Sequence, residues 1–204
     1  MSLLHDLTMG AIVSRIAGML IFVALHGGML ALMARLLGSA MPEKEGRLTA
    51  SPLAHLSLWG LAMAVLFRAG WARPAHIDPA QLRGGRPALV AIAVAALLIS
   101  LALVPLLDLA RPWIAASMPR TAGYAVLTVI VAVQDISLLS VAINALPLPG
   151  LTGGLVLVAL FPDRARLWRR LEIPVLAAIV ILMVAGVLVP DRLLPILRPI
   201  FSSL

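Results

Sequence analysis

The residues most able to take part in chemistry are a histidine and its neighbours at positions 25–30 (LHGGML), inside a long apolar stretch. A helical zinc site of the H-E-x-x-H type needs two histidines four residues apart on one helix face. It also needs a glutamate between them that activates the metal-bound water. His26 supplies the first ligand, but Gly27 offers no base and Leu30 offers no second ligand. Taken alone, the stretch predicts a packed or hydrogen-bonded histidine.

Two later segments add context to this histidine. One comprises residues 46–55 (GRLTASPLAH), 70–74 (GWARP) and 78–83 (DPAQLR), and the other is 144–154 (NALPLPGLTGG). In this order and at these separations they resemble the compact bacterial branch of the site-2 protease family, the intramembrane zinc metalloproteases. The corresponding family motifs read F-H-E-x-x-H, G-R-L-T-x-N-P-x-x-H, G-W-A-K-P-V and N-L-L-P-I-P-P-L-D-G-G. The resemblance covers about residues 20–172.

Carried over residue by residue, the resemblance implies a degenerate metal site. His26 matches the first zinc histidine, and Asn144, Pro147 and Pro149 match retained positions. The remaining family positions are altered: Gly27 stands for the catalytic glutamate, Leu30 for the second histidine and Thr152 for the aspartate ligand. A catalytic zinc site uses three protein ligands plus water. With one ligand left and the base gone, we expect no bound metal and no other cofactor.

The composition predicts an integral membrane protein. The 204 residues are 62% hydrophobic and 12% charged, whereas soluble domains are about 45–50% apolar and 25% charged. Loops are short, so residues 1–204 are expected to form a single all-α membrane domain. The net charge of +7 comes from arginines scattered between apolar runs. This distribution indicates arginines that contact lipid headgroups and set the orientation in the membrane, and it disfavours a nucleic-acid partner. The absence of cysteine excludes disulfides and thiol nucleophiles.

Apolar runs predict about five transmembrane helices, since a span needs about 20 apolar residues. The expected spans are 9–37, 52–67, 88–107, 124–146 and 174–189, followed by an interfacial tail at 191–204. The second span is short enough to be re-entrant. Pro147 and Pro149 should break the fourth helix, and Gly153 and Gly154 should allow the resulting turn to pack closely inside the bundle.

Loop charges predict the orientation. Five spans place the N-terminus and the loops at 70–87 and 162–172 on one side, with nine arginines against seven cationic residues opposite. The positive-inside rule then favours a cytoplasmic N-terminus in a bacterial inner membrane. Within the last loop, we expect a lipid headgroup anchor made of Arg164, Arg166, Trp168, Arg169 and Arg170.

Asp135 is an ionisable residue inside a predicted span, which marks it as a functional candidate or as half of an ion pair. Its predicted partner is Arg35. Arg35 follows His26 by nine residues and Asp135 precedes Asn144 by nine, about 13 Å along each helix. Were these helices antiparallel, both charges would lie at one depth. A transporter with Asp135 on a proton path is an alternative, but the chain lacks inverted repeats.

The prediction for function is a non-catalytic site-2 protease-like protein that acts as a binding or structural component, for example as an accessory subunit of a larger membrane complex. Its expected partners are membrane lipids and other membrane protein subunits. The alternative is an active intramembrane metalloprotease with a rearranged metal site. No H-x-x-x-H or E-x-x-H pair supports it. A haem site using His26 and His55 is disfavoured too, because neither of them is followed by a further histidine at a productive spacing.

Overall fold

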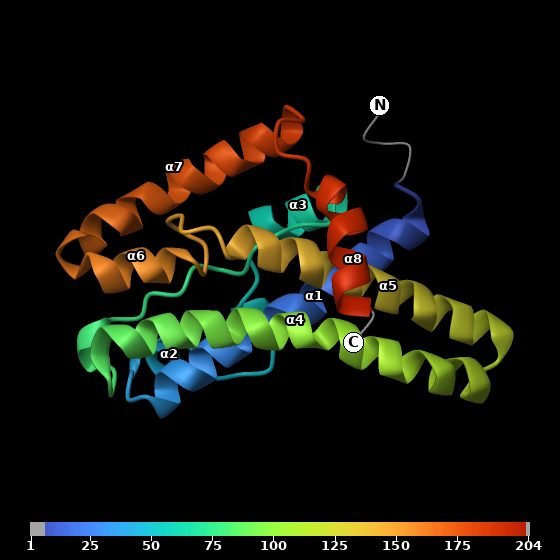
Figure 1. The fold of residues 1–204 in the computed structure, drawn as a ribbon, viewed down its shortest axis with the longest axis horizontal. Helices are drawn as coiled ribbons and strands as arrows, with labels where there is room; N and C mark the ends of the chain where they lie inside the picture. Colours follow the sequence, from blue (N-terminus) through green and yellow to red (C-terminus); the bar gives the residue numbers. More distant parts are fainter. Residues whose placement is uncertain (1–6, 203–204) are drawn as a thin grey trace.

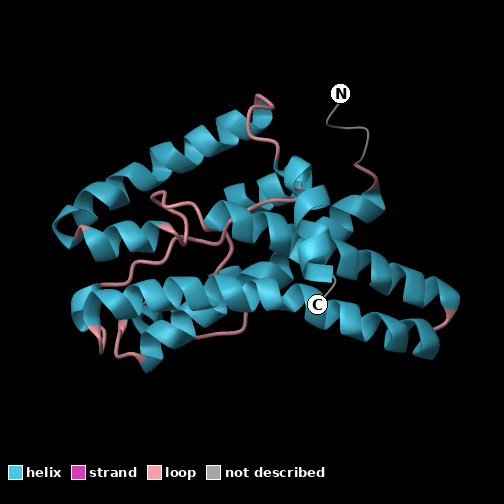
Figure 2. Cartoon of the chain, viewed as in Figure 1, coloured by secondary structure: helices cyan, strands magenta, loops and turns pink. Residues whose placement is uncertain are grey.

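The computed structural model describes residues 7–202, which are helical apart from turns and extended connections (Figure 1, Figure 2). Three long helices pack against one another: α1 (Met9–Leu36), α4 (Gly85–Ser117) and α5 (Arg120–Asn144). Each is long and apolar enough to cross a membrane, which indicates a membrane-embedded all-α protein. The only β pairing among the described residues is an isolated antiparallel bridge between Leu56 and Ala72.

Shorter helices surround these three. They are α2 (Met41–Lys44), α3 (Leu58–Phe67), α6 (Gly154–Leu160), α7 (Ala165–Val184) and α8 (Leu194–Ser202). The predicted second span is represented by α3, whose ten residues rise about 15 Å, half of a bilayer core of about 30 Å. The predicted tail contains α8, which packs against α4 and α5. The structure thus contains three helices of spanning length within residues 7–202, and the predicted count of five is not confirmed.

The short α3 changes the path of the chain. Its C-terminal connection returns to the end of α1, where the Arg83 N–H donates to the Leu37 carbonyl at 2.6 Å. Figure 1 shows the start of α4 and the α6–α7 corner at this same end of the molecule, with the start of α1 at the other. The prediction that the 70–87 loop shares a side with the N-terminus is therefore wrong, because α3 does not complete a crossing.

A buried arginine fixes this returning segment. Arg47 is 3% exposed, and its guanidinium donates to the Pro74 and Arg73 carbonyls, each at 2.8 Å. Burial lowers the pKa of Arg47, and Glu45 at 3.5 Å opposes that effect. This clamp gives a structural role to the arginine of the Gly-Arg-Leu-Thr string.

The Gly-Trp-Ala-Arg string owes its glycine to close backbone packing. The Gly70 N–H donates to Ser140 Oγ at 3.0 Å, and its carbonyl accepts from Asn144 Nδ2 at 3.0 Å. A Cβ on Gly70 would collide with the Gly60 carbonyl oxygen. Trp71 beside it is completely buried, so this segment is held between α3 and α5.

The predicted Arg35–Asp135 ion pair is wrong. Arg35 Nε lies 3.1 Å from Glu43, while Asp135 accepts from Arg198 Nε at 2.9 Å and lies 3.8 Å from Arg68. Because α1 and α4 are antiparallel, as are α4 and α5, α1 and α5 run parallel. The nine-residue offsets from the His26 level therefore point in opposite directions and separate the two charges.

We predict that Asp135→Asn lowers the free energy of unfolding by about 1–2 kcal/mol, because it removes the charge that two arginines face. The loss stays below that of a dry ion pair, since Arg198 is half exposed. Arg35→Gln is the matched control, since that pair is exposed on both sides; it should cost less than about 0.5 kcal/mol. Thermal unfolding in detergent measures both, and equal losses would contradict the assignment.

Candidate functional site

His26 forms the centre of a buried polar network. Its ring is completely buried on α1 and stacks on Phe22, with ring centroids 5.1 Å apart. Nδ1 lies 2.9 Å from Ser100 Oγ on α4, and Nε2 lies 2.7 Å from Thr152 Oγ1 in the turn before α6. One imidazole therefore joins three segments that are far apart in the sequence.

The direction of each hydrogen bond in this network follows from Ser100. Its hydroxyl donates its single proton to the Ala96 carbonyl at 2.7 Å, so Ser100 Oγ can only accept from His26 Nδ1. His26 then carries its proton on Nδ1, and the lone pair of Nε2 accepts from the Thr152 hydroxyl. The neutral ring has both nitrogens satisfied, as a buried polar group requires.

This arrangement uses the atoms that a metal site would use. A zinc-bound histidine coordinates through one nitrogen and donates from the other to a neighbouring acceptor. In the structure the Nδ1 donation is made to Ser100, while the Thr152 hydroxyl occupies the lone pair of Nε2. Thr152 stands where the resemblance places an aspartate ligand, so a hydrogen-bond donor replaces an anionic ligand at the closest contact to His26.

His55 lies directly against Gly27, the position at which the resemblance places a catalytic glutamate. A Cβ on Gly27 would lie 2.6 Å from Cγ of His55, whose side chain is completely buried. His55 Nε2 bonds the Thr49 carbonyl at 3.1 Å, while Nδ1 has no partner among residues 7–202. Burial lowers the pKa of His55, and Arg47 lowers it further. Leu30 packs in the apolar cluster that includes Leu155.

The Pro/Gly turn begins where α5 ends at Asn144 and continues to Gly154, the first residue of α6. The Gly153 N–H donates to the Asn144 carbonyl at 2.7 Å, and a Cβ on Gly153 would collide with the Leu146 carbonyl oxygen. Gly154 is similarly close to the Leu148 carbonyl. Pro147 and Pro149 lie in the non-helical stretch between. The turn thus holds Thr152 against His26 through backbone packing.

Ser100 is the functional residue that sequence reasoning missed, although it is the only polar side chain in the predicted span 88–107. The structure also separates the predicted headgroup anchor. Arg166, Trp168 and Arg169 line a pocket, whereas the Arg164 guanidinium lies over the Phe161 ring, 5.9 Å from its centroid. The headgroup role itself stays a prediction.

No cluster of three or more His, Asp or Glu side chains able to hold a metal ion occurs in the part of the chain that the structure describes. Comparison of the chain with protein-family models, curated proteins and solved structures finds no match.

Thr152→Val should lower the free energy of unfolding by about 1–3 kcal/mol, because it keeps the side-chain shape and leaves buried His26 Nε2 without a donor. Thr152→Ser retains the hydroxyl and should lose less. Thermal unfolding of the two variants in detergent gives the comparison. Equal melting temperatures would show that the hydroxyl contributes nothing to the network.

Proposed function

We propose that the protein is a non-catalytic, site-2 protease-like membrane protein that acts as a structural or binding component. The observation that carries the proposal is the hydrogen bond from Thr152 to His26 Nε2, at 2.7 Å in a completely buried position. Gly27 adds to it, because it supplies no general base and packs directly against the His55 ring. The three altered positions of the family motif are all used for packing or hydrogen bonding.

As a structural component, the chain offers extended apolar surface to its surroundings. The 33 residues of α4 extend about 50 Å, well beyond a hydrocarbon core of about 30 Å. Near the connection to α5, Trp113 is 78% exposed and Tyr124 is 76% exposed. Aromatic side chains of this kind suit a membrane interface or a partner subunit. We infer that lipids and other membrane protein subunits cover these surfaces, as they would if the chain were an accessory subunit of a larger complex.

The proposed membrane arrangement is a bundle in which α1, α4 and α5 cross the bilayer, while α3 and the apolar half of α7 enter it. Ten of the sixteen Lys and Arg residues lie toward the end where α4 begins: Arg35, Lys44, Arg47, Arg73, Arg83, Arg86, Arg164, Arg166, Arg169 and Arg170. The positive-inside rule assigns this end to the cytoplasm of a bacterial inner membrane. The first residues of α1 then lie at the opposite face, the reverse of the orientation expected from five crossings.

This orientation can be tested by labelling, because the chain contains no cysteine. We expect single cysteines at Arg83 and Arg164 to react with an impermeant maleimide only after cells are opened. A cysteine at Arg120, on the connection between α4 and α5, should react in intact cells. The reverse pattern would contradict the proposed orientation.

The non-catalytic proposal predicts no stoichiometric zinc, since one ligand position of three is retained. Elemental analysis of the purified chain should give far less than one zinc per molecule, with His26→Ala indistinguishable from wild type. The triple variant Gly27→Glu, Leu30→His, Thr152→Asp should bind zinc weakly at best, because the His55 ring fills the space beside position 27. Near-equimolar zinc that disappears in His26→Ala would favour the active metalloprotease.

A further inference from the structure

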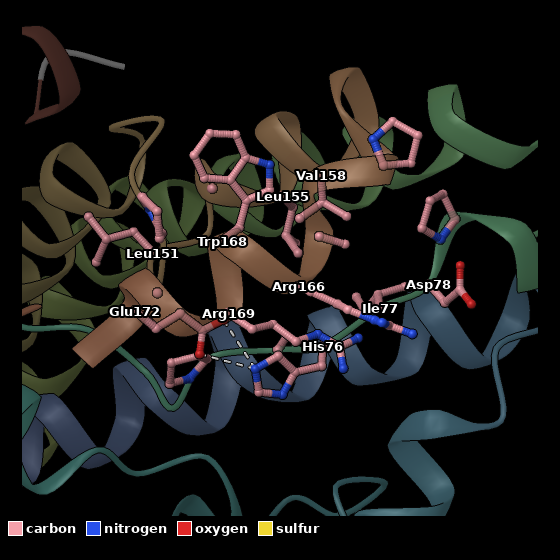
Figure 3. A pocket seen from close by; sticks show the side chains of 18 of the residues that line it. His76, Ile77, Asp78, Leu151, Leu155, Val158, Arg166, Trp168, Arg169 and Glu172 are labelled. Atoms are coloured by element: carbon pink, nitrogen blue, oxygen red, sulfur yellow. Dashed lines mark hydrogen bonds and ion pairs between the residues drawn. The ribbon is translucent and has the colours of Figure 1, made fainter. Parts of the chain in front are cut away.

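A pocket of about 480 Å³ lies outside the His26 network, within the size range of small-molecule sites. It is bounded by the extended segment 74–78 with Pro79, the turn and α6, and the first turns of α7 (Figure 3). Leu155 and Val158 give it an apolar wall, while the α7 side carries Arg166, Arg169 and Glu172. The pocket therefore combines an apolar surface with fixed charges.

The charges around the pocket are of both signs. His76 Nε2 lies 3.1 Å from both carboxylate oxygens of Glu172, as the dashed lines in Figure 3 show, and Asp78 accepts from the Ala80 N–H at 2.9 Å. Within residues 7–202, the side chains of Arg166, Arg169 and Asp163 make no hydrogen bond or ion pair with another residue. Two guanidinium groups and one carboxylate thus remain available to a ligand.

A third donor adds to the two arginines. The indole Nε1 of Trp168 is shielded from solvent, and no acceptor in the described part of the chain pairs with it. Trp168 lines the same pocket. The lining side chains of Trp168, Arg166 and Arg169 suit an anionic oxygen, because an indole N–H can donate only and guanidinium groups match phosphate oxygens by paired donation.

The position of the pocket on α7 indicates where such an anion comes from. The arginine-rich first turns of α7 are followed directly after Glu172 by exposed apolar residues, with Ile173 81% exposed and Ile181 66% exposed. This change from cationic to apolar along one helix is typical of a membrane interface, where phospholipid phosphates lie. The apolar wall at Leu155 and Val158 suits the first carbons of the acyl chains of such a lipid.

We propose that this pocket binds the headgroup of a membrane phospholipid that carries both a phosphate and an amine. Arg166, Arg169 and the Trp168 N–H bind the phosphodiester, and Asp163 faces the amine. The mixed charge of the lining favours such a zwitterionic headgroup over a purely anionic one. Free inorganic phosphate shares the anion chemistry but uses neither Asp163 nor the apolar wall. The site does not depend on the state of the His26 network.

Native mass spectrometry of the full chain in detergent tests the proposal, with short-chain phosphatidylethanolamine and phosphatidylglycerol of matched chains as probes. Wild type should bind one ethanolamine lipid, and Arg166→Gln/Arg169→Gln should weaken that binding at least about tenfold. Arg164→Gln/Arg170→Gln removes the same charge from positions that do not line the pocket, and it should bind like wild type. Trp168→Phe keeps an aromatic ring and should weaken binding about threefold to tenfold.

The other arms identify the source of the phosphate and the role of the amine. Inorganic phosphate at the concentration of the lipid should not compete with lipid binding. Asp163→Asn should abolish the preference for phosphatidylethanolamine over phosphatidylglycerol. Equal affinities of the two arginine double variants would overturn the site. Effective competition by inorganic phosphate would overturn the lipid assignment. If wild type bound phosphatidylglycerol more tightly than phosphatidylethanolamine, and Asp163→Asn did not change this order, the role of the amine would be overturned.

Discussion

The hydrogen bond from Thr152 to His26 holds the middle of the bundle together. It lies in the completely buried interior and connects α1 with the turn that links α5 to α6, while the other ring nitrogen connects α1 with α4. A buried imidazole without these partners would carry a large desolvation cost. The three segments must therefore meet at fixed distances, and the turn must approach α1 closely enough for a hydroxyl to reach the ring.

Glycine makes that approach possible. At Gly27, Gly70 and Gly153 a side chain would collide with a histidine ring or with a backbone carbonyl. Small residues allow backbones to approach in membrane bundles, where packing and hydrogen bonds replace the hydrophobic effect between helices. Two positions that the protease-like motif singles out, Gly27 and Thr152, are thus also positions of close packing. Residues that would supply a base and a ligand in an enzyme here provide contact surface and a hydroxyl donor.

Sequence reasoning anticipated the local features better than the path of the chain. Composition predicted a helical membrane protein, and the prolines at 147 and 149 predicted the helix break that the structure contains. The meeting of His26 with Thr152 followed from the resemblance. Ser100 was overlooked because a single serine in an apolar span forms hydrogen bonds in many different contexts, and only the neighbouring ring of His26 gives it a role.

The error in the Arg35–Asp135 pair has one physical origin. Residues 52–67 are apolar enough to suggest a crossing, but the helix they form has only ten residues and the chain returns to the end of α1. One crossing fewer makes α1 and α5 parallel. Residues that follow His26 on α1 and residues that precede Asn144 on α5 then lie at different depths, not at the same depth. Hydropathy cannot detect this, since the clamp that turns the chain back consists of Arg47 and two distant backbone carbonyls.

Nitrogen NMR of the imidazole rings shows where the His26 proton lies and whether Nε2 is free to bind a metal. The chain has four histidines, so the His26 signals can be assigned by their loss in His26→Gln. We expect a neutral ring with the proton on Nδ1, a hydrogen-bonded acceptor at Nε2, and no change in either signal when zinc is added. A proton on Nε2, or an Nε2 signal that shifts with stoichiometric zinc, would contradict a site closed by Thr152.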